Sequence, residues 1–275
     1  MFEDKVIPLD SWVSESVDWL VMNYRDFFQA IKWPIEQTLN GLDTGLNTLH
    51  PLITIGIVAL IAYRMAGKKL AFFSATTLVL IGLLGLWEDT MTTLAMVLSS
   101  VAFCALVGIP IGILAGSNDR FEAALRPVLD AMQTTPAFVY LVPIVMLFSV
   151  GNVAGVLATI VFALPPIIRL TSLGIRQVHP ELVEAAQAFG ATRWQVLRRV
   201  QIPLALPTIM AGLNQTIMMA LSMVVIAALI GAGGLGSPVI LGLNTLDIGQ
   251  AVTGGLGIVL IAIILDRITQ SMARK

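Results

Sequence analysis

Apolar residues are grouped along the chain in long runs that short polar stretches separate. A hydrocarbon core about 30 Å thick needs roughly 20 apolar residues per helix, and fewer where neighbouring helices cover it. Seven runs come close to this length, at residues 48–64, 69–87, 91–116, 137–150, 153–173, 206–231 and 249–268. The pattern therefore predicts an all-α polytopic membrane protein with about seven transmembrane helices.

The fourth run is short, and a glycine-rich stretch follows it at once. GNVAG at 151–155 has the composition of a tight turn. We therefore expect the fourth and fifth runs to form a helical hairpin, and the stretch between the third and fourth runs, which holds Arg120 and Arg126, to be a loop.

The first 47 residues alternate apolar and charged positions instead of forming an apolar run. Apolar residues, most of them large or aromatic, recur there at helical spacing, at Trp12, Val13, Val17, Leu20, Tyr24, Phe27, Phe28 and Ile31. Charged residues occupy the other faces, which is typical of a helix that lies in a membrane interface. We expect residues 1–47 to be an extracytoplasmic amphipathic tail and residues 48–275 to be the transmembrane domain.

Composition supports the membrane assignment. The chain is 57% hydrophobic and 12% charged, and its mean hydropathy is +0.88. A soluble domain of 275 residues would carry far more surface charge. The single cysteine, Cys104, lies in an apolar run, so neither a disulfide framework nor a cysteine metal site is expected.

The basic residues fall on one side of the seven-span arrangement. Of the 16 lysines and arginines, all except Lys5, Arg25 and Lys32 lie in the same set of alternate connections or in the C-terminal tail. Because short cytoplasmic loops carry an excess of lysine and arginine, this side is predicted to be cytoplasmic. The N-terminus is then outside and the C-terminus inside.

A polar segment interrupts the apolar pattern at 180–207. Pro180 suits the first turn of a helix, Glu181 and Glu184 favour its N-terminal half, and Gly190 suits the left-handed residue that ends it. Thr192 and Gln195 then form a potential capping box for a second helix, which Pro203 and Pro207 are expected to stop. A connection usually takes about 2–8 residues, so this loop, over 176–205, is interpreted as a docking surface.

Motifs for catalysis or nucleotide binding are missing from the sequence. His50 and His179 have no cysteine or carboxylate at ligand spacing, and the Gly67-Lys68 pair lacks the upstream glycine of a phosphate loop. We therefore expect no enzyme activity, no metal and no cofactor bound by this chain. Ionisable groups at mid-membrane depth are also nearly absent, which argues against a proton- or sodium-coupled carrier.

Neutral polar residues are the candidates for a transport pathway. The favoured reading of residues such as Thr135, Asn214 and Ser222 is hydrogen bonding between helices, and for Met218 it is packing. The alternative is that they line a path, with the Thr135-Pro136 break as a gate. The candidate set is Thr135, Pro136, Tyr140, Asn214, Met218 and Ser222.

The polar segment also resembles a known motif. It is similar to the EAA loop of ABC-importer permeases. The matching residues are Glu184-Ala185-Ala186, Gly190 after three further residues, and Val200-x-Ile202-Pro203 after nine more, with Val200 and Ile202 as conservative departures. In that family the loop is the coupling helix that sits in a cleft of the ATPase subunit. The resemblance implies ATPase coupling for Glu184, Ala185, Ala186, Gly190, Arg193 and Pro203.

The likeness extends over nearly the whole chain. Segments such as LDAMQTTPAFVYLVPIVMLF and NQTIMMALSMVVIAALIGAGGLG resemble the glycine betaine/proline betaine permeases of osmoprotectant importers. This implies a type I ABC importer fold in a bacterial cytoplasmic (inner) membrane. The expected partners are a second copy of the chain, two copies of an ABC ATPase that holds ATP and magnesium, an extracytoplasmic substrate-binding protein and the lipid bilayer, but no nucleic acid.

Two alternatives stay open. The same transporter class moves other solutes, so choline, carnitine or an amino acid such as histidine is an alternative cargo. A stand-alone, ATP-independent carrier or channel is the other, although the polar segment would then have no purpose.

Overall fold

The computed structural model describes residues 9–273, and this part of the chain consists of helices and the turns that join them. The helices are α1 (Leu9–Asn23), α2 (Arg25–Thr48), α3 (Pro51–Ala66), α4 (Lys68–Leu83), α5 (Trp87–Ser117), α6 (Asp119–Thr134), α7 (Ala137–Phe148), α8 (Asn152–Arg176), α9 (Pro180–Ala188), α10 (Arg193–Val196), the π-helical segment η1 (Leu197–Gln201), α11 (Ile202–Ala228), α12 (Gly236–Thr245) and α13 (Ile248–Ala273). The all-α prediction is confirmed for this part of the chain.

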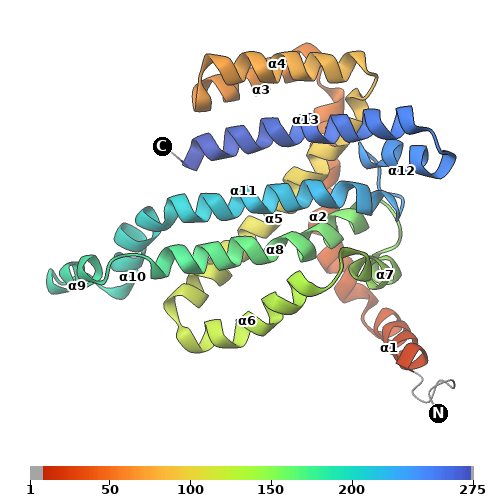
Figure 1. Ribbon diagram of the computed structural model, residues 1–275. Helices are drawn as coiled ribbons and strands as arrows, with labels where there is room; N and C mark the ends of the chain where they lie inside the picture. Colours follow the sequence, from red (N-terminus) through yellow and green to blue (C-terminus); the bar gives the residue numbers. More distant parts are fainter. Residues whose placement is uncertain (1–8, 274–275) are drawn as a thin grey trace.

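Four long apolar helices form the body of the molecule. They are α5, α8, the run Arg193–Ala228 that includes α11, and α13, and each is long and apolar enough to cross a membrane. α8, α11 and α13 lie side by side, and α5 crosses them at a slant (Figure 1). These helices correspond to the predicted third, fifth, sixth and seventh runs.

The other predicted runs differ in detail. α3 and α4 have 16 residues each and pack together as a hairpin. α7 has only 12 residues and joins α6 across a bend of 97°. The predicted loop around Arg120 is therefore a helix, because α6 has an amphipathic pattern and Asn118 caps its first turn. Counting each bent pair as one span gives up to six spans instead of seven.

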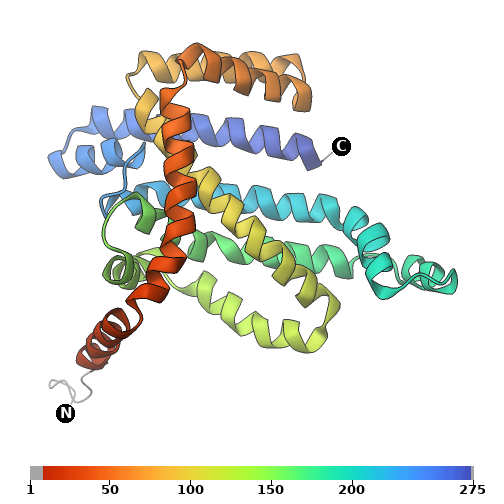
Figure 2. The ribbon, with the colours of Figure 1, turned by 180° about the vertical axis from the view of Figure 1, so that it is seen from behind.

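The N-terminal segment is two helices instead of one. The chain breaks at Tyr24, and α2 then runs across the body instead of along it (Figure 2). Ile35 and Leu39 of α2 are buried against α5 and its neighbours, and the ring of Phe28 meets that of Phe148 edge-on at 5.7 Å. The exposed apolar residues that remain on α1, such as Trp12 and Trp19, fit the predicted interfacial character.

The close contact of α5 with α8 depends on small residues. A Cβ atom on Gly112 would lie 2.5 Å from Cβ of Thr171 and 2.8 Å from the carbonyl oxygen of Ile168. Neither distance is tolerable, so only glycine permits this approach of the two backbones.

The two ends of the long helices differ in charge. One end holds the turn at Gly67, the α5–α6 junction, α9, α10 and the C-terminal end of α13 (Figure 1). The opposite end holds α12 and the α7–α8 turn. The basic residues from Arg64 to Arg267 belong to segments at or near the first end, whereas the loop after α12 carries only Asp247 as a charged residue. The charge bias read from the sequence is thus a bias between the two ends of the molecule.

Candidate functional site

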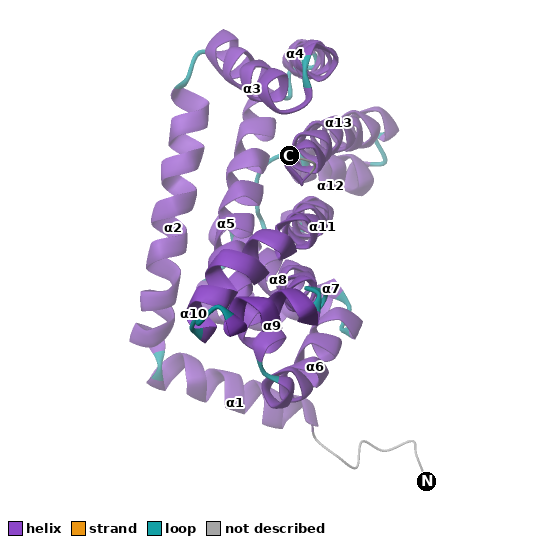
Figure 3. Cartoon of the chain, turned by 90° about the vertical axis from the view of Figure 1, so that its left-hand side faces the viewer, coloured by secondary structure: helices purple, strands orange, loops and turns teal. Residues whose placement is uncertain are grey.

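The predicted docking surface is a projection at the end of the molecule, formed by α9 and α10. It points toward the viewer in Figure 3, where it stands in front of the ends of α8 and α11. α9 begins with Pro180 in its first turn and Glu181 beside it, and none of its residues is buried. A helix that projects from the body with no buried residue is available to a partner surface.

The turn between α9 and α10 is rigid. Gly190 has φ of +83°, and its N–H and that of Ala191 donate to the carbonyls of Gln187 and Ala186. The hydroxyl of Thr192 accepts from the N–H of Gln195, and the Gln195 side chain accepts from the N–H of Thr192 at 2.8 Å. Both predictions, the left-handed glycine and the capping box, are confirmed.

The surface of the projection is aromatic as well as charged. Glu184, Ala185 and Arg193 are exposed and Ala186 is half-buried. Phe189 is 94% exposed and Trp194 is 66% exposed, and neither was singled out from the sequence. Their position on either side of Gly190 was the signal, since a large apolar side chain beside an exposed turn is available to a partner. A hollow of about 410 Å³ lies beside Phe189 and Gly190.

The projection continues into α11 without a stop. Arg193–Ala228 is one helical run, so the prediction that Pro203 and Pro207 end the element is wrong. The reason is η1, in which the N–H of Ile202 donates to the carbonyl of Leu197 five residues earlier. This wider turn accommodates the exposed Pro203, which has no N–H to donate and whose ring crowds the preceding turn.

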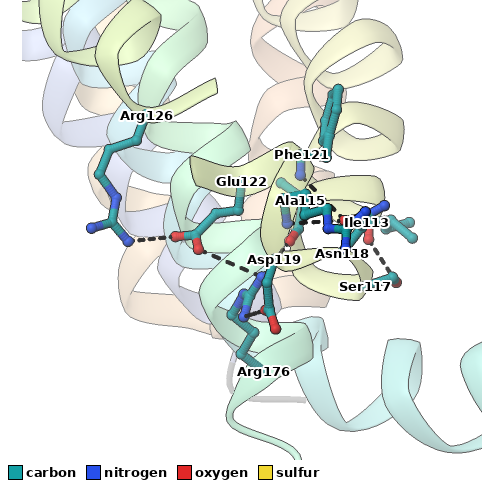
Figure 4. A network of polar contacts seen from close by, with 10 residues as sticks. Ile113, Ala115, Ser117, Asn118, Asp119, Phe121, Glu122, Arg126 and Arg176 are labelled. Carbon is teal, nitrogen blue, oxygen red and sulfur yellow. Dashed lines mark hydrogen bonds and ion pairs between the residues drawn. The ribbon is translucent and has the colours of Figure 1, made fainter. Parts of the chain in front are cut away.

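An ion-pair network joins α6 to α8 at the same end of the molecule (Figure 4). The guanidinium of Arg176 donates to Oδ1 of Asp119 at 2.5 Å and to the carbonyl of Ala115 at 2.7 Å, and lies 3.5 Å from Glu122. Arg126 donates to Glu122 at 2.9 Å and thereby lowers the pKa of that carboxyl below its usual range. The partners are up to 61 residues apart, so the sequence alone did not reveal the network.

Three pathway candidates lie at the bend between α6 and α7. Thr135 and Pro136 form the break, and the hydroxyl of Thr135 donates to the carbonyl of Ala131 in its own chain segment at 2.7 Å. Tyr140 donates its hydroxyl proton to the carbonyl of Met132 at 2.7 Å, across the bend. These contacts fix the angle of the bend instead of linking separate spans.

The other candidates lie on α11. Asn214 donates to Asp266 of α13 at 2.9 Å, as the inter-helical reading predicts. Met218 and Ser222 are exposed one turn apart, and Ser222 donates to the carbonyl of Met218 at 3.0 Å. For Ser222 and Thr135 the prediction of an inter-helical hydrogen bond is wrong, because each hydroxyl donates to the carbonyl four residues earlier in its own segment. The structure thus divides the candidates between the α6–α7 bend and α11.

Comparison with known proteins agrees with this architecture. Residues 108–275 match the family described as "Binding-protein-dependent transport system inner membrane component". The inward-facing methionine ABC transporter MetNI has a chain that aligns with 69% of this one and 94% of its own length, with a TM-score of 0.62 and 24% identity. This likeness confirms the fold of a type I ABC importer permease.

Curated relatives resemble the chain over nearly its full length. The glycine betaine/proline betaine transport system permease protein ProW of Escherichia coli (strain K12) is 53% identical over 99% of this chain and 77% of its own. The glycine betaine permease OpuAB of Bacillus subtilis (strain 168) is 46% identical over 98% and 95%. The glycine betaine/carnitine permease GbuB of Listeria monocytogenes serotype 1/2a (strain 10403S) is 44% identical over 98% and 96%. The chain is therefore a permease, a non-catalytic membrane component, and belongs to the family of binding-protein-dependent transport system inner membrane components.

Proposed function

We propose that this chain is the membrane-spanning permease of an ABC importer that takes up glycine betaine and proline betaine-type compatible solutes. The observation that carries the coupling role is the α9–α10 projection, which is rigid, has no buried residue in α9 and joins two long apolar helices. The names of ProW, OpuAB and GbuB support the solute class.

In this proposal the projection transmits force from a separate ATPase. Phe189 and Trp194 enter an apolar cleft of that subunit, while Glu184 and Arg193 form its charged rim. ATP and magnesium are held by the ATPase, and closure of two ATPases moves the projection. The permease acts as a homodimer, with the N-terminus outside, the C-terminus in the cytoplasm, and an extracytoplasmic binding protein that delivers the solute.

The solute path needs no charged site in this proposal. Thr135, Pro136 and Tyr140 at the α6–α7 bend form the gate, and Asn214, Met218 and Ser222 on α11 form the wall. Selectivity for the quaternary ammonium group then rests mainly on the binding protein, because aromatic cages recognise such cations. Carnitine is a second candidate cargo, since the name of GbuB includes it.

Two substitutions test the coupling role in vesicles that contain the ATPase, the binding protein and radiolabelled solute. Gly190→Val places a β-branched side chain at φ of +83°, and Glu184→Lys reverses an exposed charge on α9. We expect uptake to fall at least tenfold while the chain inserts normally and ATP hydrolysis continues.

Matched controls separate coupling from folding. Gly85→Val introduces the same type of strain at φ of +74° but at the opposite end of the molecule, and Glu181→Lys reverses a neighbouring charge. Normal uptake by both Gly190→Val and Glu184→Lys would contradict the coupling role.

Cargo is tested in the same vesicles by competition. Unlabelled glycine betaine and proline betaine are expected to block uptake, whereas choline and histidine are not. Solute flux through the purified chain without any ATPase would instead favour the carrier or channel.

A further inference from the structure

A cavity of about 490 Å³ lies between the α3–α4 hairpin and α13, away from the coupling projection. Leu70 and Phe73 of α4 and Ile263 of α13 form its apolar wall, and Lys69, Arg267 and Gln270 supply its polar groups. It lies at the end of α4 that follows the Gly67 turn and near the C-terminal end of α13 (Figure 1). These helices meet although nearly 200 positions separate them in the sequence.

The cavity has a strong positive bias. No acidic residue lines it, and within residues 11–272 neither Lys69 nor Arg267 has an ion-pair partner. The nearby carboxylate of Asp266 is already occupied, since it accepts from Asn214 and from Gln270. Two unpaired cations that converge on one cavity favour an anionic ligand.

The start of α4 adds to the positive charge around the cavity. Its first turn begins with Lys68 and Lys69, has no acidic residue, and receives no side-chain cap from Gly67. Lysine is disfavoured at the positive end of a helix unless an anion offsets it. The same location that concentrates basic residues therefore also presents uncapped backbone N–H groups.

Both basic residues lie near helix ends, where a membrane helix meets the lipid headgroups. With a rise of 1.5 Å per residue, the 16 residues of α4 measure about 24 Å, and the 26 residues of α13 measure about 39 Å. α4 is thus shorter than a hydrocarbon core of about 30 Å. Lys69 stands in the first turn of this short helix and Arg267 in the last two turns of α13. Basic side chains so close to helix ends reach the level of the lipid headgroups.

We propose that this cavity binds the phosphate headgroup of an anionic phospholipid. Lys69 and Arg267 hold the phosphate from two sides, and the apolar wall of Leu70, Phe73 and Ile263 carries the start of an acyl chain. Basic pockets between membrane helices bind anionic headgroups in this manner. The lipid joins the peripheral hairpin to α13, which packs on α11.

Native mass spectrometry of the assembled transporter tests this proposal. The complex is delipidated and titrated with phosphatidylglycerol or with zwitterionic phosphatidylcholine. We expect phosphatidylglycerol to bind more tightly, and Lys69→Gln and Arg267→Gln each to weaken it about fivefold, which corresponds to ~1 kcal/mol per basic residue.

The controls isolate the cavity from net charge and from folding. Arg120→Gln removes one positive charge from an exposed site at the same end of the molecule and is expected to leave binding unchanged. Lys69→Arg keeps the positive charge and is expected to bind the lipid as tightly as the original chain. Size-exclusion profiles identify any variant that misfolds.

Four results would overturn the proposal. The first is equal affinity for the two lipids, and the second is an unchanged affinity in both glutamine variants. The third is binding to the isolated chain that disappears in the assembled transporter, which would show that a second copy or the ATPase covers the cavity. Displacement of the lipid by millimolar inorganic phosphate would show a soluble anion site instead.

Discussion

Single residues decide how closely the helices of this permease approach one another. Arg176 is an example, because its guanidinium bonds both to Asp119 of α6 and to the carbonyl of Ala115 in α5. Its side chain is 32% exposed, so water weakens the ion pair but does not replace the bond to the carbonyl. One side chain thereby holds three helices together.

We expect Arg176→Gln to destabilise the chain by about 1 kcal/mol, since it removes a charge-assisted bond to a backbone carbonyl. Arg126→Gln is the matched control, because Arg126 forms a pair within one helix and its side chain is 65% exposed, so its loss is expected to lower the stability less. Thermal unfolding in one detergent compares the two variants. Equal melting temperatures would contradict the bridging role of Arg176.

Gly112 sets the distance between α5 and α8 in the same way. Gly112→Ala places a methyl group 2.5 Å from Cβ of Thr171, so the helices must separate, at a cost of about 1–3 kcal/mol. Gly56→Ala in α3 meets nothing within 4 Å and is expected to be neutral or slightly stabilising. The stability of both variants is compared by the fraction of protein that stays folded after detergent extraction. A Gly112→Ala variant as stable as the original chain would refute the packing argument.

At the scale of elements, features that depend on neighbouring residues were predictable and features that depend on distant ones were not. The start of α9 at Pro180, the turn at Gly190 and the capping box at Thr192 follow from sequence chemistry over a few positions. The partner of Asn214 lies 52 residues away, so no local pattern identifies Asp266.

Two errors in the predicted elements have physical causes. The charges of α6 interrupt the apolar pattern and so predict a loop, yet these charges form the Glu122–Arg126 pair and face Arg176. Pro203 predicts the end of a helix because proline breaks an α-helix, but a π-turn accommodates it. Hydropathy alone detects neither an amphipathic helix such as α6 nor a change of helix type.

The π-turn gives an element-scale prediction. Pro203→Ala restores an N–H and allows Leu197–Gln201 to become α-helical, which rotates α10 against α11 by roughly 100°, the angle of one residue. We expect the variant to fold and to insert but to lose most ATP-driven uptake, because Phe189 and Trp194 then face the wrong direction. Pro207→Ala, one turn further along α11, is the control. Unimpaired uptake by Pro203→Ala would exclude a role for the π-turn in orientation.

At the scale of the whole molecule, the two charge-distinct ends define an orientation. The Gly67 turn and the projection share one end, and α12 lies at the other (Figure 1). The positive-inside rule then predicts that the first end faces the cytoplasm.

A membrane-impermeant maleimide tests this orientation in intact cells. We expect Thr245→Cys in α12 to react from outside and Lys68→Cys to react only after permeabilisation, since both positions are exposed in the structure. The native Cys104 is buried and provides the unlabelled background. Labelling of Lys68→Cys from outside would invert the proposed topology.

The helical run from Arg193 to Ala228 also connects the projection directly to the opposite end of the molecule. Its 36 residues measure about 54 Å. A tilt of about 5° at the projection therefore displaces the far end by roughly 5 Å. That end leads into the turn at Gly231 and Gly234, where the N–H of Gly233 donates to Asn152 of α8 and the N–H of Leu235 donates to Thr93 of α5. A displacement of this end is therefore passed on to α5 and α8. Under the proposed coupling, we expect a small movement of the ATPase to displace the opposite end of this helical run by several ångströms.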